Sequence, residues 1–400
     1  MTTITTHMPR IEFFVRLLVR LQATLSILSL LLAIHGCGGH DASDQCEADM
    51  AYRGSFAPPV ADALRTASRP LRPRIPLPVA DTSELDQAFA RALEGNSSVE
   101  ATASVILDEG GFWSAGSKNR FWWGSVGKTF TAMLVLQLVQ QGKLALSTRV
   151  DDFAPYVPHG DSMTIRHLLS HTSGLYNFTR APTYQHESIY RRHETLIAFA
   201  LLQGSEWCPG MNWGYSNTGY LLLGKIIEDV TGQPFDEVLN SYIRGRLAPT
   251  SLAALSPGPA PSDVVLPSRE GPAPSITTPF AAGNVVGSSF DMALAWKHFL
   301  SGGLITNDQV AIMFEPLYPT DEPGRAYGLG VMVYQGTAVD GDIWLGHQGS
   351  IDGARSFVCW SSRHGATVAV AVTGGGDARA IATALLDTLP PAGYMSREKQ

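Results

Sequence analysis

The stretch FWWGSVGKTFTAMLVLQLVQQG (residues 121–142) contains a glycine, a lysine and a threonine in the order that closes a phosphate-binding loop. Such a loop requires G-x-x-x-x-G-K-[ST], so Gly127, Lys128 and Thr129 would need an opening glycine at position 122. Trp122 occupies that position. The spacing therefore excludes a nucleotide-binding loop and leaves a serine followed by a lysine three residues later.

Ser125 opens a mostly apolar segment that predicts a buried helix running to Gly142. Residues i and i+3 lie on one face of a helix, so Lys128 is expected beside Ser125, where it can help to draw off the hydroxyl proton. In the first turn, the helix dipole and free N–H groups also favour a developing oxyanion. The motif alone is not specific, because Ser396 and Lys399 match it in a polar tail and because serine is a common N-cap.

The composition is that of a globular protein. The chain has 400 residues, of which 44% are hydrophobic and 16% are charged, so it can bury a sizeable core. The formal net charge of -7 and the absence of a lysine or arginine block exclude a broad basic surface for nucleic acid. We expect a small-molecule or peptide substrate and no nucleic-acid partner.

The N-terminus has the layout of a secretory signal. Three arginines precede an apolar run, Leu21–Ile34, which is short for a membrane span. His35-Gly36-Cys37 then resembles the box in which the cysteine becomes a lipidated N-terminus. We expect residues 1–36 to be a signal peptide of the lipoprotein type, and the protein to be exported to the bacterial cell envelope or periplasm as a membrane-tethered lipoprotein. An uncleaved signal anchor is the alternative.

The composition also divides the rest of the chain. Residues 37–80 are rich in glycine, alanine and proline, which predicts an extended tether. The folded domain is expected at residues 81–390, followed by a polar tail at 391–400.

Few cysteines are available for disulfides. If Cys37 carries lipid, Cys46, Cys208 and Cys359 remain. An exported compartment permits a bridge between Cys208 and Cys359, although the sequence does not show that they are close.

No spacing of cysteines and histidines indicates a zinc site. His167 and His171 are four residues apart, but the glutamate of an H-E-x-x-H site does not follow His167. They are better interpreted as bracing the loop that follows. We expect neither a metal nor a cofactor.

Strand patterns lie near both ends of the domain, and helical patterns lie between them. ATASVILDEGGFWSAGS (101–117) predicts two strands around a turn, after a helix in 81–95. Four strand-like runs at hairpin spacing occur between 327 and 375, and a helix is predicted in 377–389. The pattern predicts an α+β fold, in which one antiparallel sheet is flanked by terminal helices and a helical lobe is inserted in the chain.

Two further motifs follow the serine and lysine. Tyr215-Ser216-Asn217 lies in a loop before a predicted helix, and His347-Gln348-Gly349 lies at the end of a predicted strand. With these motifs in this order, the chain resembles the superfamily of serine β-lactamases and penicillin-binding proteins. It is more similar to the branch of class C β-lactamases, D-alanyl-D-alanine carboxypeptidases and related esterases, in which Y-x-N replaces S-D-N.

The resemblance extends over about residues 82–390. It includes MTIRHLLSHTSGL (163–175) and PFAAGNVVGSSFDMALAWKHFLSGG (279–303). It implies the β-lactamase/transpeptidase-like variant of the α+β fold.

The resemblance also implies catalytic roles. Ser125 is the nucleophile that is acylated, and Lys128 shares or relays its proton. Tyr215 is the general base or acid, which requires cationic charge to lower its pKa from about 10 toward neutrality. Asn217 hydrogen-bonds the amide of the substrate, and the backbone N–H groups of Ser125 and Ser350 form the oxyanion hole.

The third motif departs from the usual K-T-G. His347 replaces the lysine and is expected to support the Tyr215 region and any anionic group of the substrate. Gly349 lets the substrate backbone approach the strand. Gln348 replaces a threonine that binds the substrate carboxylate, so carboxylate recognition is in question, and Arg355 is a candidate replacement.

We therefore expect an exported serine hydrolase that forms an acyl-enzyme on Ser125 and transfers the acyl group to water. A D-alanyl-D-alanine carboxypeptidase-like peptidase is favoured over an efficient β-lactamase because of the altered third motif. An esterase of the same family and a non-catalytic penicillin-binding-like envelope protein are the alternatives. Retention of Ser125, Lys128 and Tyr215 argues against the non-catalytic protein.

Overall fold

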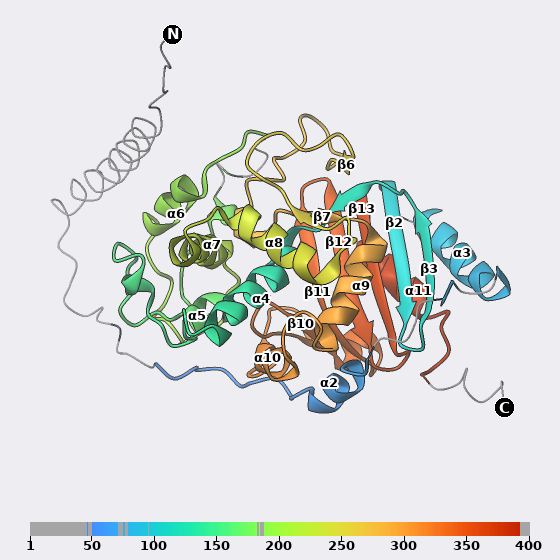
Figure 1. The fold of residues 1–400 in the computed structure, drawn as a ribbon, viewed down its shortest axis with the longest axis horizontal. Helices are drawn as coiled ribbons and strands as arrows, with labels where there is room; N and C mark the ends of the chain where they lie inside the picture. Colours follow the sequence, from blue (N-terminus) through green and yellow to red (C-terminus); the bar gives the residue numbers. More distant parts are fainter. Residues whose placement is uncertain are drawn as a thin grey trace, which may run out of the picture. The chain divides into compact units, whose positions relative to one another are not determined.

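The computed structural model describes residue 46 and residues 50–70, 75–76, 79–94, 96–181, 184 and 188–392 (Figure 1). The predicted signal peptide (1–36), Cys37 and most of the predicted polar tail lie outside the described residues. The helices within these ranges include none that is both long and apolar enough to cross a bilayer.

Nine strands of the described chain form the main sheet, in the order β1-β3-β2-β13-β12-β11-β10-β9-β8. They are β1 (Ile75–Pro76), β2 (Ser98–Leu107), β3 (Gly111–Gly116), β8 (Tyr318–Pro319), β9 (Arg325–Tyr327), β10 (Met332–Gln335), β11 (Ile343–Ile351), β12 (Ala354–Ser361) and β13 (Ala366–Gly374). Neighbouring strands are antiparallel except β1 and β3. The predicted antiparallel sheet, built from both ends of the domain, is confirmed.

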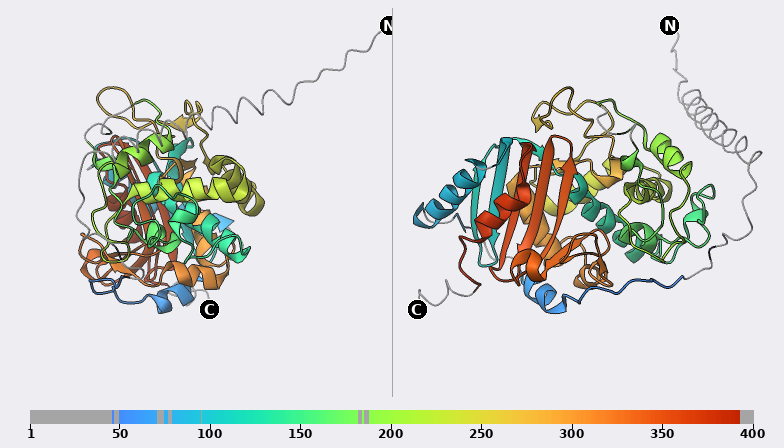
Figure 2. Two further views of the ribbon diagram at one scale, coloured as in Figure 1. Left: turned by 90° about the vertical axis from the view of Figure 1, so that its left-hand side faces the viewer. Right: turned by 180° about the vertical axis from the view of Figure 1, so that it is seen from behind.

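Both faces of the central strands are buried, which explains their continuously apolar sequences. In β13, Val368, Val370 and Val372 pack with the terminal helices α3 (Val79–Glu94) and α11 (Ala378–Leu386). Ala369 and Ala371 point to the other face, as the two-residue period of a strand requires, and join the larger core there. Figures 1 and 2 show α11 on one face of the sheet and α9 (Ser289–Leu300) on the other.

The inserted lobe is helical. It contains α4 (Gly127–Gln140), α5 (Ile165–Ser170), α6 (His193–Leu201), α7 (Asn217–Thr231) and α8 (Phe235–Leu247), and α10 (Asn307–Met313) follows α9. The predicted central helix is confirmed as α4, which is buried along most of its length. Ser125 does not belong to its first turn but to a preceding 3-10 turn, η1 (Gly124–Val126).

A small second sheet connects the lobe to the main sheet. Its order is β5-β7-β4-β6, with β4 (Arg120–Trp122), β5 (Ala253–Ala254), β6 (Val264–Val265) and β7 (Val285–Gly287). Strands of two or three residues carry no readable pattern, so the sequence did not predict this sheet. Strand β4 leads directly into η1 and thus places Ser125 where the two sheets meet.

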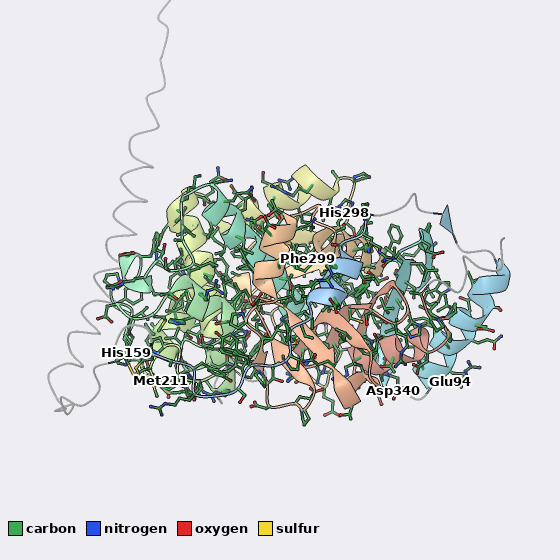
Figure 3. The ribbon with its side chains drawn as sticks, turned by 90° about the horizontal axis from the view of Figure 1, so that it is seen from below. Glu94, His159, Met211, His298, Phe299 and Asp340 are labelled. Carbon is green, nitrogen blue, oxygen red and sulfur yellow. A yellow bond between two sulfur atoms is a disulfide. The ribbon has the colours of Figure 1, made fainter. Side chains whose placement is uncertain are left out.

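Residues 50–70, the longest described part of the predicted tether, lie against the domain. The segment contains α2 (Ala61–Ala67), and the Ala63 and Ala67 side chains are buried in the main core. The Arg53 N–H donates to the Met211 carbonyl oxygen at 2.9 Å. Met211 lies at the opposite end of this unit from Glu94 of α3 (Figure 3). The segment differs from an extended tether because its apolar side chains find a surface to pack against.

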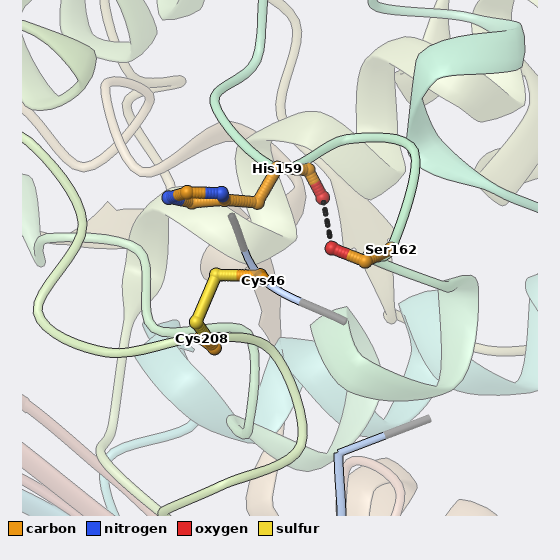
Figure 4. The surroundings of a disulfide bond; sticks show 4 residues. All are labelled: Cys46, His159, Ser162 and Cys208. Atoms are coloured by element: carbon orange, nitrogen blue, oxygen red, sulfur yellow. Dashed lines mark hydrogen bonds between the residues drawn. A yellow bond between two sulfur atoms is a disulfide. The ribbon is translucent and has the colours of Figure 1, made fainter. Parts of the chain in front are cut away.

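A disulfide joins this segment to the lobe, between Cys46 and Cys208, with His159 and Ser162 around it (Figure 4). The bridge between Cys208 and Cys359 considered from the sequence is therefore wrong. Cys359 is a free thiol, fully buried in β12, and packs in the core beneath the terminal helices.

Candidate active site

The turn that carries Ser125 is fixed by the residue that precedes it, Trp123. The buried Trp123 donates its N–H to the Val285 carbonyl oxygen at 2.9 Å and its ring N–H to the Gly287 carbonyl oxygen at 3.0 Å. Its own carbonyl oxygen accepts from the Ser356 hydroxyl at 2.7 Å. Both sheets therefore set the position of the serine.

Glycine is required at position 349 because the backbone of Trp123 lies close to it. A Cβ atom at this position would lie 2.3 Å from the Trp123 carbonyl oxygen, a distance that real Cβ atoms do not show. The sequence predicted that this glycine makes room for substrate. The structure gives a different reason, because the backbone of Trp123 fills that space.

Lys128 contacts Ser125 as predicted. Its side chain is fully buried, and its Nζ atom lies 3.0 Å from Ser125 Oγ, 2.6 Å from Asn217 Oδ1 and 2.7 Å from the Ala282 carbonyl oxygen. Burial lowers the pKa of the amine well below its usual value. A neutral amine has two N–H donors, which the two carbonyl oxygens satisfy, and one lone pair, which then faces the Ser125 hydroxyl. The arrangement suits a general base.

Tyr215 is the third member of the predicted catalytic group and is also present. Its hydroxyl is hydrogen-bonded with Ser125, and the Lys128 Nζ atom lies 5.1 Å from the centre of its ring. Burial raises the pKa of the phenol, and the bond with Ser125 and the charge of Arg325 counter only part of that rise. The expected lowering of its pKa is therefore wrong, because the nearest amine is itself driven toward its neutral form. The resting site holds a neutral phenol.

Asn217 holds Lys128 in place. Its side-chain oxygen accepts from Lys128, and its NH₂ group donates to Asn177 Oδ1 and Thr179 Oγ1, both at 3.2 Å. It also lines the cavity described below. Its role in binding the substrate amide stays a prediction.

His347 supports the tyrosine region but is not available to a substrate anion. Its side chain is fully buried, and burial, the largest cause, lowers its pKa to about 3. Its Nδ1–H donates to the Gln348 carbonyl oxygen at 2.8 Å, so its Nε2 accepts from the Tyr327 hydroxyl at 3.1 Å. Its support of an anionic substrate group stays a prediction, and His347 is not among the residues that line the cavity described below.

Gln348 points to the opposite face of β11 from His347, as neighbouring residues of a strand do. Its Oε1 atom accepts from the hydroxyl of buried Tyr334 at 3.2 Å. Tyr334 belongs to the core beneath the terminal helices. Gln348 is therefore held away from Ser125 and does not fill the position of a carboxylate-binding threonine.

Ser350 lies at an open edge of the sheet. Strand β10 pairs with β11 only over Ile343–Gly346, so 347–351 have no strand partner on that side among the described residues. Ser350 is exposed and lines the same cavity as Ser125. The structure thus brings together both residues predicted to form the oxyanion hole.

A cavity of about 370 Å³ opens over Ser125. Its lining includes the apolar side chains of Trp122, Phe178, Tyr184 and Ile189. The polar lining includes Ser350 of β11, Asp352 of the turn after it and Arg355 of β12. Asp352 is paired with Arg269 at 2.8 Å.

Arg355, the candidate replacement for the carboxylate-binding threonine, lies at the cavity. Its Nη1 group donates to the carbonyl oxygens of Ile351 and Ala354. These bonds orient the guanidinium group and leave its Nη2 group without an acceptor among the described residues. A cation held in this way can receive a carboxylate. Its place at the cavity depends on the turn between β11 and β12, which consists of Asp352 and Gly353, a pair that is typical of a two-residue hairpin turn.

No group of three or more histidine, cysteine, aspartate or glutamate side chains in the described part of the chain is arranged to hold a metal ion.

The family model named Beta-lactamase matches residues 88–389. The chain belongs to the Beta-lactamase family. This confirms the predicted superfamily, and with a serine, a lysine and a tyrosine in one site it supports a serine hydrolase in general.

Curated relatives cover part of the chain. It is 33% identical over 194 residues to penicillin-binding protein 4 of Amycolatopsis lactamdurans, which is 42% of this chain and 50% of that protein. It is 28% identical over 228 residues to a putative penicillin-binding protein of Bacillus subtilis, 54% of each. The chain spans about half the length of these relatives.

Solved structures confirm the predicted fold class. A D-stereospecific amidohydrolase from Streptomyces sp. is similar with a TM-score of 0.67 and 26% identity, covering 76% of this chain and 97% of that one. The penicillin-binding protein of Bacillus halodurans has a TM-score of 0.64 and 22% identity, covering 75% and 98%. D-amino acid amidase from Ochrobactrum anthropi SV3 has a TM-score of 0.67 and 23% identity, covering 77% and 100%.

Proposed function

We propose that this protein is a serine hydrolase that forms an acyl-enzyme on Ser125 and cleaves the amide bond before the C-terminal residue of a short D-amino-acid peptide. The observation that carries the proposal is the placement of Lys128. Its buried amine lies 3.0 Å from Ser125 Oγ and is held by two carbonyl oxygens. A penicillin-binding protein among the relatives and a D-stereospecific amidohydrolase among the similar structures support the substrate class.

The acylation step follows from the resting geometry. Neutral Lys128 takes the proton of the Ser125 hydroxyl as its oxygen attacks the substrate carbonyl carbon. The N–H groups of Ser125 and Ser350 stabilise the oxyanion. As the carbon–nitrogen bond breaks, the proton returns from Lys128 by way of the Tyr215 hydroxyl to the leaving nitrogen. Water then attacks the ester, and the same groups carry its proton back to Ser125.

The cavity walls support the direction of binding. The apolar side chains of the lining accept the side chain of the acyl portion, and Arg355 receives the free carboxylate of the leaving residue. Arg355 thereby takes the place of the missing threonine of the third motif.

We also propose that the protein works outside the cytoplasm, tethered to the membrane. The basic residues and apolar run at the N-terminus support export. The Cys46–Cys208 disulfide adds to this support, because disulfides persist in oxidising compartments.

A substrate series tests the proposal. The full chain is assayed with a peptide that ends in D-Ala-D-Ala, with the same peptide carrying a C-terminal amide, with the all-L peptide and with an aryl ester. We expect the highest kcat/KM for the first substrate and none for the all-L peptide. Preference for the ester with no cleavage of either D-peptide would identify an esterase and reject the proposal.

A further inference from the structure

His171 has no role in the reaction described above, although it lies next to Tyr215. It follows the last residue of α5 and has a φ of 61°, in the left-handed region. Its side chain is 1% exposed. It belongs to the stretch HTSGL, whose backbone runs alongside the loop that leads to Tyr215.

His171 holds the main chain on both sides of Tyr215. Its carbonyl oxygen accepts from the Gly214 N–H at 2.9 Å, and its Nδ1 atom accepts from the Ser216 N–H at 3.2 Å. The residues immediately before and after the tyrosine are thus bound to a single histidine. The backbone direction at Tyr215 is fixed by these two bonds.

The imidazole ring also contacts the phenol directly. The ring centres of His171 and Tyr215 are 4.1 Å apart, and His171 lies 4.5 Å from the ring of Tyr327. Tyr327 is in turn bound by His347 through its hydroxyl group. The phenol of Tyr215 therefore packs against a row of buried rings, His171 and Tyr327, that ends at His347 of the third motif.

The imidazole must be neutral for this arrangement. A protonated ring has no acceptor nitrogen, so the bond from the Ser216 N–H would be lost. Burial, the largest cause, lowers the pKa of His171 well below its usual value, in agreement with the acceptor role of Nδ1. Nε2 has no hydrogen-bond partner among the described residues, so the contacts at Nδ1 and the ring faces set the ring orientation.

Other bonds hold the loop farther from the tyrosine. The Gly210 N–H donates to the Thr172 carbonyl oxygen and the Glu206 N–H donates to the Gly174 carbonyl oxygen, both at 2.8 Å. These bonds do not reach the residues next to Tyr215. A loss of loop structure and a loss of tyrosine placement can therefore be separated by experiment.

We infer that His171 is a positioning residue that aims the Tyr215 hydroxyl at Ser125, an inference that rests on the proposed role of Tyr215 in proton transfer. A proton donor that is misplaced by about 1 Å can cost roughly 10²-fold in rate. Substrate binding depends on the residues that line the cavity and not on the direction of the Tyr215 hydroxyl. The effect is therefore expected in kcat and not in KM.

Two substitutions separate the contacts of His171. Asparagine tolerates the left-handed region and can offer an oxygen to the Ser216 N–H, but it lacks the ring. Phenylalanine keeps a ring and lacks the acceptor. His159→Phe is the matched control, because His159 also has a positive φ, 56°, and lies beside the disulfide.

We expect His171→Phe to lower kcat about 10²-fold with KM changed less than about threefold, His171→Asn to lower kcat less, and His159→Phe to leave both unchanged. In a Tyr215→Phe background, His171→Phe should cause no further loss, because the group that it aims is absent. Equal losses in both backgrounds would overturn the inference and leave the proposed function standing.

Hydrogen–deuterium exchange provides a readout that needs no substrate. The peptide covering residues 205–217 should exchange faster in His171→Phe than in wild type, with the increase at Gly214–Ser216 and not at Glu206 or Gly210. Unchanged exchange at Ser216 would overturn the inference. A wild-type protein that turns over none of the substrates would refute the proposed function, and this exchange measurement would still decide the placement.

Discussion

The Nζ atom of Lys128 lies 3.0 Å from the Oγ atom of Ser125. Helix α4 begins between these two residues, at Gly127. The two other atoms that hold this amine come from distant parts of the chain, Asn217 and Ala282. Complete burial favours the neutral form of the lysine. The two carbonyl oxygens then take both N–H donors, so that the lone pair faces the nucleophile. The proposed chemistry follows from this single relationship.

Replacing Lys128 by methionine should slow proton removal and keep the packing of the site, while the Asn217 and Ala282 oxygens lose one donor each. Methionine has a similar length and needs no partner in a buried site. We expect acylation of Ser125 to slow by roughly 10²- to 10⁴-fold. Single-turnover kinetics measure the step, and Lys143→Met, which changes an exposed lysine, should behave like wild type. A rate that survives Lys128→Met would assign the base to another group.

The pH dependence of acylation should show the titration of Lys128. Burial lowers the pKa of this amine, and the neutral form is the base, so the rate rises as pH rises through a value below the usual 10.4 or so. His347, with a pKa of about 3, is already neutral across the working range and should not contribute. Stopped-flow acylation from pH 5 to pH 10 measures the profile. A rate that falls as pH rises from 6 to 8 would contradict this assignment.

Arg355→Ala should remove the preference for a free carboxylate. We expect kcat/KM for the carboxylate-ended peptide to fall about tenfold, a modest effect because the guanidinium group is exposed, and to stay unchanged for the C-terminal amide. Arg363→Ala, just beyond the opposite end of β12, is the matched control. Equal losses for both peptides would show that Arg355 supports the turn and does not recognise the carboxylate.

The Cys46–Cys208 disulfide should stabilise the domain, because it closes a loop with a sequence separation of 162. Reduction should lower the free energy of unfolding by about 2–4 kcal/mol. Urea denaturation with and without reductant measures this difference. A Cys46→Ser/Cys208→Ser double variant should match the reduced wild type and be insensitive to reductant. If the double variant still responds, another thiol pair is responsible.

The parts of the fold that could be predicted from sequence are those with long patterns. Strands β2, β12 and β13 and helices α4, α9 and α11 each contain an apolar pattern or run that is long enough to mark the element in the sequence. The strands of the second sheet have only two or three residues, which is too few to show a pattern, and they help to place Ser125.

The site divides in a similar way. Ser125, Lys128 and Tyr215 were predicted to meet, and they do. Three other features were not predicted: the direction of the pKa shift of Tyr215, the face on which Gln348 lies, and the disulfide partner of Cys208. Each depends on what surrounds the residue in the folded chain. His171 was predicted only as a brace, since sequence spacing does not show that it binds both neighbours of Tyr215.

Formation of a covalent adduct on Ser125 would identify this residue as the nucleophile. The full chain is mixed with a penicillin, quenched rapidly in acid and analysed by intact mass and peptide mapping. We predict one added penicillin on the peptide that contains Ser125, no adduct on Ser125→Ala, and a full adduct on Ser396→Ala, which removes the other S-x-x-K match. An adduct that persists on Ser125→Ala, or a Ser125 that neither a penicillin nor a serine-directed fluorophosphonate labels, would contradict the account.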